Sequence, residues 1–512
     1  MKKNNLLTSA LVLSIGGLVA KILGALYRIP LTNIVGSYGM GLYQLVFPPY
    51  ILFLTLAQAG VPVALSKLIA EKHQLGLENQ GRKVFSMSFV FLLATGLASA
   101  VAMCLLANFI ANAQGNGETA TAFLVVAPAL VFVPVTNVLK GYFQGNMNMT
   151  PCSVTTVVEQ IVKLAVGLFC AVKFMPNVHK AVLGAVFAIT VSEFCSMAIM
   201  SVVYLVHKKK HPLPKLLWQK GDFSTLSKQL VGLAVPVVLG GFVMQISQVI
   251  DSVMVVNLLS TPNATEMYGL WTGPVNSMLG LPIALSSGVA VSALPGITKT
   301  YHAGDKQQLN DNFNAILKLT IVIALPCALG MIALSKPILQ LLYGSLPQAE
   351  IEISAMLLSL SGVSIVFLAV LQTCISVCQA VGKPYASVVI VSLAIVVKAL
   401  VNLFLLPNSQ VNIFGAAISE TMCYLFGAIC VIIYLKKSLG LNLDVSSCVV
   451  KPLASGLAMT LCITIAVAFA SNVFCTKFGT LLLIALCGCV YFASLSLLKA
   501  FNTSELVLSP SK

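Results

Sequence analysis

The sequence predicts an all-α protein that crosses a membrane many times. Of its 512 residues, 58% are hydrophobic and only 9% are charged, whereas a soluble globular chain has about 25% charged residues. Apolar runs of about 20 residues, the length that a helix needs to cross a bilayer, fill nearly the whole chain. The two halves also resemble each other. Together these observations predict about 14 transmembrane helices, arranged as two six-helix lobes in a parallel repeat plus two C-terminal helices.

The predicted spans divide the chain into three parts. Residues 1–220 form an N-lobe with helices 1–6, residues 221–440 form a C-lobe with helices 7–12, and residues 441–512 hold helices 13–14 and a short tail. The first apolar run lacks a small-residue cleavage site, so we interpret it as a transmembrane helix and not as a signal peptide. Most basic residues fall in loops after even-numbered spans, which predicts that both termini are cytoplasmic.

Composition argues against several other classes of protein. The net charge of +15 is distributed between apolar runs, which favours contact with anionic membrane lipids and not with nucleic acid. Most of the 14 cysteines lie inside apolar runs and the five histidines lie in predicted loops, so we expect neither a metal site nor a cofactor. No phosphate-binding Gly-x-x-x-x-Gly-Lys motif occurs. A membrane enzyme would need acids or histidines gathered at one membrane face. The sequence shows no such cluster, so we do not expect an enzyme.

The internal repeat has a nearly constant spacing. Gly41–Tyr43 matches Gly269–Trp271 at a lag of 228 residues, and Glu193 matches Glu420 at a lag of 227. Pro151 and Lys163 match Pro384 and Lys398 more loosely. Because the lag covers an even number of spans, both copies have the same orientation. Parallel repeats of this kind are typical of transporters that bind substrate between two lobes.

Basic residues within the predicted spans are candidates for a substrate cavity, because a charge at membrane depth is costly and tends to be functional. Lys21 and Arg28 lie two helical turns apart and therefore share one helix face. We interpret them, with Lys163 and Lys398, as a lining for an anionic head group. For Arg28 the alternative is that its side chain extends to the outer interface.

Acidic residues within the spans have two interpretations each. Glu159 and Lys163, four residues apart, can pair as a structural ion pair or line the cavity. Glu193 and Glu420 are candidates for ion coupling, or they hydrogen-bond between helices. Asp251 follows two glutamines on a polar face, which indicates either a wet cavity or polar helix packing.

Prolines interrupt two spans that are equivalent in the repeat. Pro48, Pro49 and Pro62 lie in the second span, and Pro274 and Pro282 lie in the eighth. Proline removes a backbone donor and kinks a helix. Matched broken helices indicate gates in transporters, so Pro49 and Pro274 are gating candidates, although prolines also occur as inert kinks.

Five short motifs occur in order along the chain: Tyr27–Leu31, Gly36–Tyr43, Gly60–Lys67, Phe143–Gly145 and Glu159–Lys163. With them the chain resembles, over most of the first twelve spans, the stage V sporulation protein B-like branch of the multidrug/oligosaccharidyl-lipid/polysaccharide exporter superfamily. This resemblance implies a multi-pass protein of the bacterial cytoplasmic membrane, with cavity cations that hold a pyrophosphate and a groove for the lipid tail at the last two helices. Related flippases also carry arginines on spans 2 and 8; this chain has none there, and Lys163 and Lys398 are the candidate substitutes.

The resemblance implies a flippase that moves an undecaprenyl-pyrophosphate-linked glycan, with lipid II first among them, to the outer leaflet. Its expected partners are that lipid-linked glycan, membrane lipids and proteins of cell-wall synthesis. The cavity residues would be Lys21, Arg28, Lys163, Lys398 and Glu159. Two alternatives remain: a flippase for another polysaccharide precursor, and a cation-coupled multidrug exporter of the same superfamily.

Overall fold

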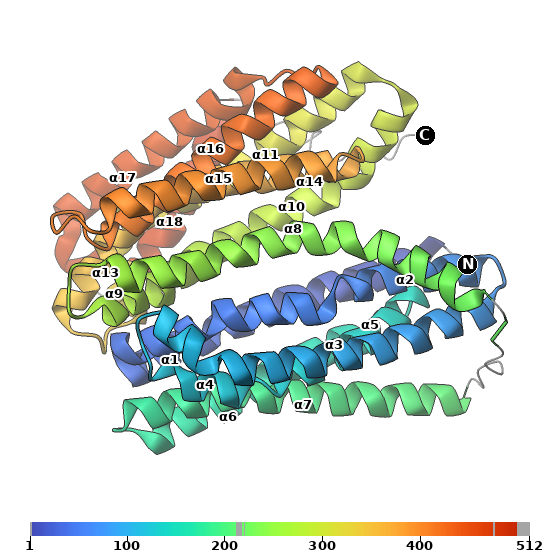
Figure 1. Ribbon diagram of the computed structural model, residues 1–512. Coiled ribbons are helices and arrows are strands. Elements are labelled where there is room, and N and C mark those ends of the chain that lie inside the picture. The colour runs from blue at the N-terminus through green and yellow to red at the C-terminus, as the bar shows by residue number, and fades with distance from the viewer. Residues whose placement is uncertain (1–2, 211–217, 220, 475–476, 499–512) are drawn as a thin grey trace. The chain divides into compact units, whose positions relative to one another are not determined.

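The computed structural model describes residues 3–210, 218–219, 221–474 and 477–498. Every regular element within those ranges is helical, which confirms the all-α prediction (Figure 1). Nine of the described helices are long and apolar enough to cross a membrane, or ten if the bent pair α13 (Gln348–Gly362) and α14 (Ser364–Ala380) forms one span. The count of fourteen stays a prediction, and the predicted C-terminal tail lies outside the described residues.

The chain forms two compact units. Unit 1 comprises Met1–Asn257 and Asn263–Gly269, and unit 2 comprises Leu258–Pro262 and Leu270–Lys512. Helix α8 therefore packs with unit 1, whereas the lobe boundary predicted near residue 220 rests on the repeat and stays a prediction. The helices of unit 1 are α1 (Lys3–Gln58), α2 (Val61–Gln74), α3 (Glu78–Ala113), α4 (Thr119–Val126), α5 (Ala129–Gly145), α6 (Thr150–Phe174), α7 (Val178–Lys210), α8 (Asp222–Leu258) and α9 (Ala264–Leu270).

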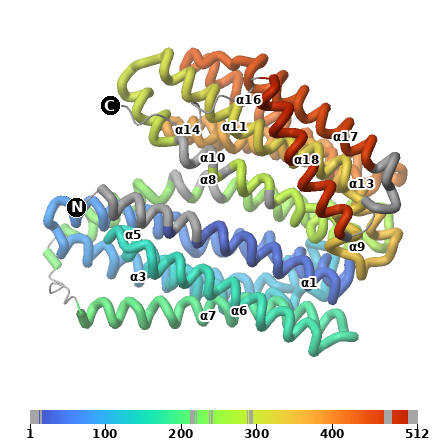
Figure 2. Tube along the Cα trace, turned by 180° about the vertical axis from the view of Figure 1, so that it is seen from behind, coloured from blue at the N-terminus to red at the C-terminus, as the bar shows by residue number. Residues whose placement is uncertain are grey.

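Unit 2 contains the remaining helices. A π-helical segment precedes α10, and the last two long helices, α17 and α18, lie side by side (Figure 2). Helix α17 also packs against α11. Besides α13 and α14, the elements of unit 2 are η1 (Trp271–Val275), α10 (Asn276–Ala303), α11 (Lys306–Ala333), α12 (Ser335–Leu342), α15 (Pro384–Leu405), α16 (Phe414–Leu439), η2 (Ser446–Val450), α17 (Lys451–Phe474) and α18 (Lys477–Leu497).

The helix breaks differ from those that the prolines predict. Element α1 holds the first predicted span and most of the second, as two helices that join at a kink at Gly36 (φ 72°); the second of them continues through Pro48 and Pro49. The break comes at Gly60, in the left-handed conformation with φ 67°, and Pro62 then lies in the first turn of α2. Proline is tolerated inside helices in lipid and suits a first turn, whereas glycine adopts left-handed backbone without strain. The prediction that Pro49 interrupts the span is therefore wrong, because the helix continues through it. Pro274, in contrast, lies in the irregular segment η1.

Two repeat-equivalent glycines meet where α1 and α9 cross inside unit 1. A methyl group on Gly41 would collide with the backbone carbonyl of Thr265, and one on Gly269 would collide with the carbonyl of Ser37 and the backbone of Gly41. Beside this crossing, the amide of Asn116 donates to the Thr265 hydroxyl at 3.1 Å. Only glycine allows the two backbones to approach this closely.

Candidate functional site: two lysines over aromatic rings

Glu159 forms its ion pair with a lysine from another helix. Nζ of Lys140, on α5, lies 3.8 Å from Oε2 of Glu159, on α6, and both side chains are about 15% exposed (15% and 16%). Lys140 also donates to the hydroxyl of Thr156 at 3.1 Å, and Gln160 donates to Oε1 of Glu159 at 2.9 Å. Of the two interpretations of Glu159 and Lys163, the direct ion pair between them is therefore not formed. The Glu159 carboxylate pairs instead with Lys140 on the neighbouring helix α5, a contact that spacing along the sequence does not show.

Lys163 lies at the centre of a wider group of charges. Its Nζ is 6.0 Å from the ring centroid of Tyr27, and it interacts electrostatically with Arg28, Glu159 and Glu193. Glu193, on α7, in turn interacts with Glu159, Lys140 and Lys163. These residues form the unit-1 cluster: Arg28, Lys140, Glu159, Lys163 and Glu193.

Packing of α1, α5, α6 and α7 brings the unit-1 cluster together. Tyr27 is buried, its hydroxyl donates to the carbonyl of Ala185 on α7 at 3.4 Å, and its ring meets the ring of Tyr43 edge-on at 6.2 Å. Gly167 lets α6 approach Tyr27, because a methyl group at this position would lie 2.6 Å from the tyrosine hydroxyl. The ring is therefore held in place beneath the Lys163 ammonium group.

Unit 2 contains a buried lysine at the position that matches Lys163 loosely in the repeat. Lys398, on α15, is only 5% exposed, and its Nζ lies 5.9 Å from the ring centroid of the buried Trp271. Trp271 is the repeat equivalent of Tyr43. Glu420, on α16, accepts a hydrogen bond of 2.7 Å from Tyr424 one helical turn later. A lysine over an aromatic ring and a glutamate therefore occur in each unit, although their partners differ.

The other predicted residues lie elsewhere. Lys21 is exposed, whereas Arg28 is half-buried and belongs to the unit-1 cluster. Asp251 is buried on α8 and interacts electrostatically with Tyr268 of α9. The structure therefore brings together Arg28, Glu159 and Glu193 with Lys163, and it places Asp251 at a separate position near the α8–α9 connection.

Sequence reasoning missed three residues of these sites. Lys140 lies at the end of the fourth predicted span, about residues 119–140, so the sequence gives no reason to place it inside the membrane, whereas α5 continues to Gly145. The aromatic run Tyr142-Phe143 after Lys140 was the signal that could have extended the span. Tyr27 and Trp271 appear in the sequence analysis only as parts of motifs. An aromatic residue among apolar ones does not indicate that a lysine lies over its ring.

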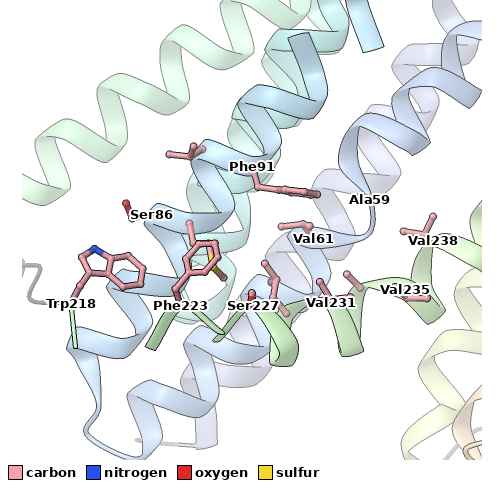
Figure 3. Close-up of a pocket in the computed structure, with 14 residues that line it drawn as sticks. Ala59, Val61, Ser86, Phe91, Trp218, Phe223, Ser227, Val231, Val235 and Val238 are labelled. Atoms are coloured by element: carbon pink, nitrogen blue, oxygen red, sulfur yellow. The ribbon is translucent and has the colours of Figure 1, made fainter. Parts of the chain in front are cut away.

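Unit 1 also contains an apolar pocket of about 710 Å³ between α2, α3 and α8. Figure 3 shows Val231, Val235 and Val238 of α8 along one side and Phe91 of α3 opposite. Trp218 stands at one end, with Nζ of Lys83 5.9 Å from its ring centroid. Lys83 also forms an ion pair with Asp222 at the start of α8, and this contact holds the pKa of the Asp222 carboxyl below its usual range. The lining suits a hydrocarbon chain and not a charged group.

The chemistry of the unit-1 cluster is that of ion recognition. Three cations face two carboxylates, so the cluster carries an excess of one positive charge when all five groups are ionised. Among the described residues, no group of three or more His, Cys, Asp or Glu side chains could hold a metal ion. A many-helix membrane protein with a half-buried ionic cluster and an internal repeat belongs to the class of membrane transport proteins.

Comparison with known proteins identifies the family. Residues 6–301 match the polysaccharide biosynthesis protein family, and residues 236–404 match the MatE family. The chain belongs to the polysaccharide biosynthesis protein family. It is 26% identical over 460 residues to the lipid II flippase MurJ of Bacillus subtilis (strain 168), which covers 85% of this chain and 84% of that protein. It is also 26% identical over 356 residues to stage V sporulation protein B of the same organism, covering 67% and 68% of the two chains.

Solved structures show the same fold. A lipid II flippase MurJ in an inward closed conformation matches with a TM-score of 0.73 and 17% identity, over 95% of this chain and 98% of that one. An inward-facing multidrug resistance MATE family transporter of the MOP superfamily matches with a TM-score of 0.72 and 16% identity, over 82% and 94%. The fold is therefore that of MOP-superfamily transporters. The predicted family resemblance is confirmed, and the chain is a transport protein and not an enzyme.

Proposed function

We propose that this protein is an alternating-access flippase that moves an undecaprenyl-pyrophosphate-linked glycan, with lipid II as the first substrate to test, from the cytoplasmic to the outer leaflet. The observation that carries the proposal is the cationic excess of the unit-1 cluster within a chain of this family. A pyrophosphate would gain charge-assisted contacts there, while the lipid tail would stay beside α17 and α18. A membrane potential that is negative inside favours outward movement of an anion by about 2.3 kcal/mol per charge per 100 mV.

The carboxylates of the cluster have a matching role in this proposal. Glu159 and Glu193 keep the lysines ordered and partly neutralised while the site is empty. An arriving pyrophosphate would then compete with the carboxylates for the same ammonium groups. Exchange of this kind lets a site bind an anion and also release it, because the cations are never left unpaired.

The experiment measures lipid II exposed on the outer face of bacteria that are depleted of their own flippase. Wild-type protein should restore exposure, and Lys163→Gln should abolish most of it. Lys173→Gln is the matched control, because Lys173 lies on the same helix and also faces a ring, 5.7 Å from the centroid of Phe169, but is exposed. Well-expressed wild-type protein that restores no exposure would contradict lipid II as the substrate.

A cation-coupled multidrug exporter is the second candidate, favoured by the MatE match over residues 236–404. In that case Glu159 and Glu193 would bind the coupling cation and the substrate would be cationic. Resistance of expressing cells to a panel of cationic drugs separates the two. Drug resistance that is lost in Glu193→Gln, with no change in lipid II exposure, would favour the exporter.

A further inference from the structure

A second polar pocket lies in unit 2, away from the lysine site of that unit. It has a volume of about 400 Å³ and is formed by the end of α10, the start of α11, the turn before α15 and the end of α16. Three lysines line it: Lys306, Lys383 and Lys437. These positions belong to loops that the distribution of basic residues predicts to be cytoplasmic.

Local structure explains why the three ammonium groups converge. Lys306 begins α11 directly after Asp305, whose carboxylate accepts the backbone N–H of Gln308 at 2.9 Å. Lys383 immediately precedes Pro384 at the start of α15, and Lys437 lies in the last turn of α16. Four helix ends therefore meet around one cavity, and three of them contribute a lysine.

The charge of this pocket is not balanced by the protein. Asp305 is the acidic residue of the lining, and its carboxylate already caps α11. Within the described part of the chain, none of the three lysines takes part in an ion pair. Ser438, which also lines the pocket, has a hydroxyl group that lacks a hydrogen-bond partner among the described residues. The lining thus offers an excess of two positive charges.

The repeat distinguishes two of the three lysines. The lag of 228 residues places Glu78 at the position equivalent to Lys306, and the looser match of Pro151 with Pro384 places Thr150 at the position equivalent to Lys383. The lag of 227 residues places Lys210 at the position equivalent to Lys437, so the basic end of α7 recurs at the end of α16. Three lysines therefore occur together at these positions in unit 2, whereas the matched positions of unit 1 hold one lysine.

We propose that the three-lysine pocket of unit 2 binds a phosphoryl group, supplied either by the head group of an anionic phospholipid or by a soluble phosphate compound. Lysine ammonium groups bind phosphate oxygens as point charges, and three of them around one cavity match a dianionic or bridging phosphate. Basic pockets between the ends of transmembrane helices are the sites where anionic head groups bind membrane proteins. This site is separate from the unit-1 cluster, and the proposal does not depend on which substrate the protein transports.

The test measures binding of two probes to the purified full-length protein. One probe is a short-chain phosphatidylglycerol, with short-chain phosphatidylcholine as the zwitterionic reference of zero net charge, and the other is inorganic pyrophosphate. The triple variant Lys306→Gln/Lys383→Gln/Lys437→Gln removes the pocket cations. The control variant Lys208→Gln/Lys209→Gln/Lys210→Gln removes the same charge from exposed positions at the end of α7.

We expect at least one anionic probe to bind the wild type and the control variant equally, and the triple variant about tenfold or more weakly. Preference for phosphatidylglycerol over both other probes would identify a lipid head group, and preference for pyrophosphate would identify a soluble source. Equal binding by wild type and triple variant would overturn the proposal, as would no binding of either anionic probe to the wild type. Should the triple variant fail to fold, the single substitution Lys437→Glu at an exposed position gives the same comparison, with the same loss expected.

Discussion

Each unit places a lysine over an aromatic ring, but the surroundings of the two lysines differ. In unit 1 Lys163 lies over Tyr27 within a cluster of five charged residues, whereas in unit 2 the equivalent Lys398 lies over Trp271 and is almost fully buried. The equivalent glutamates diverge too. Glu420 receives a hydrogen bond from Tyr424, but the repeat places Met197 at the corresponding position after Glu193. A lysine and a glutamate therefore recur at matched positions, but the rings beneath the lysines do not correspond, because Trp271 matches Tyr43 and not Tyr27. The surrounding residues make unit 1 the more ionic site.

We expect the largest effect on stability from a substitution at the contact between Gly41 and Gly269. Gly41→Ala should lower the free energy of unfolding by about 3 kcal/mol, because the new methyl group meets the Thr265 backbone carbonyl, which cannot move alone. Gly280→Ala is the control, since no atom lies within 4 Å of its added methyl group. Unfolding of the purified variants in detergent measures both. Equal stability of Gly41→Ala and wild type would contradict the close crossing of α1 and α9.

A comparison of two ion pairs tests whether burial makes the Lys140–Glu159 pair of the unit-1 cluster stronger than an exposed pair in unit 2. A double-mutant cycle with Lys140→Gln and Glu159→Gln should give a coupling energy of about 1–2 kcal/mol, because both side chains are largely shielded from water. The Lys336–Glu352 pair of unit 2 is shorter, at 2.8 Å, but its side chains are 47% and 48% exposed. Its cycle, with Lys336→Gln and Glu352→Gln, should give less than about 1 kcal/mol. A larger coupling energy for the exposed pair would refute this ranking.

The hydrogen bond to Glu420 predicts a smaller effect. Tyr424→Phe removes the only described donor to Oε1 and should cost about 1 kcal/mol of stability. Tyr385→Phe serves as the control, because Tyr385 is 61% exposed. Thermal unfolding of both variants measures the difference. If the two substitutions shift the midpoint equally, the Tyr424 hydroxyl does not stabilise Glu420.

The smallest expected effect concerns pH and the α3–α8 contact. Lys83 lowers the pKa of Asp222 below the model-peptide value of 3.8, so the stability from this pair is complete above about pH 4 and declines as pH falls through the lowered pKa. Asp222→Asn should therefore flatten the acid limb of a stability profile and leave Lys83 unpaired at neutral pH. An unchanged acid limb in the variant would show that another carboxyl group controls it.

The fold and the family could be predicted from the sequence, but only part of the unit-1 cluster could. Composition and apolar length determine that the chain is helical and lies in a membrane, because those properties depend on averages over many residues. The contact of Glu159 with Lys140 depends instead on how α5 packs against α6, which no local spacing reports. The helix break at Gly60 was missed for a similar reason: Pro48 and Pro49 are the more obvious local signals, yet lipid-embedded helices accommodate them. The equivalence of Glu193 and Glu420 was visible in the repeat, whereas their different partners were not.

The most direct test of the proposed role of the unit-1 cluster is binding of lipid II to the purified full-length protein. Wild type, Lys163→Gln and the matched control Lys173→Gln would be compared in the same lipid environment. We predict that Lys163→Gln weakens binding about tenfold or more while Lys173→Gln leaves it unchanged. Equal affinity of all three proteins for lipid II would contradict the claim that the unit-1 cluster holds the pyrophosphate.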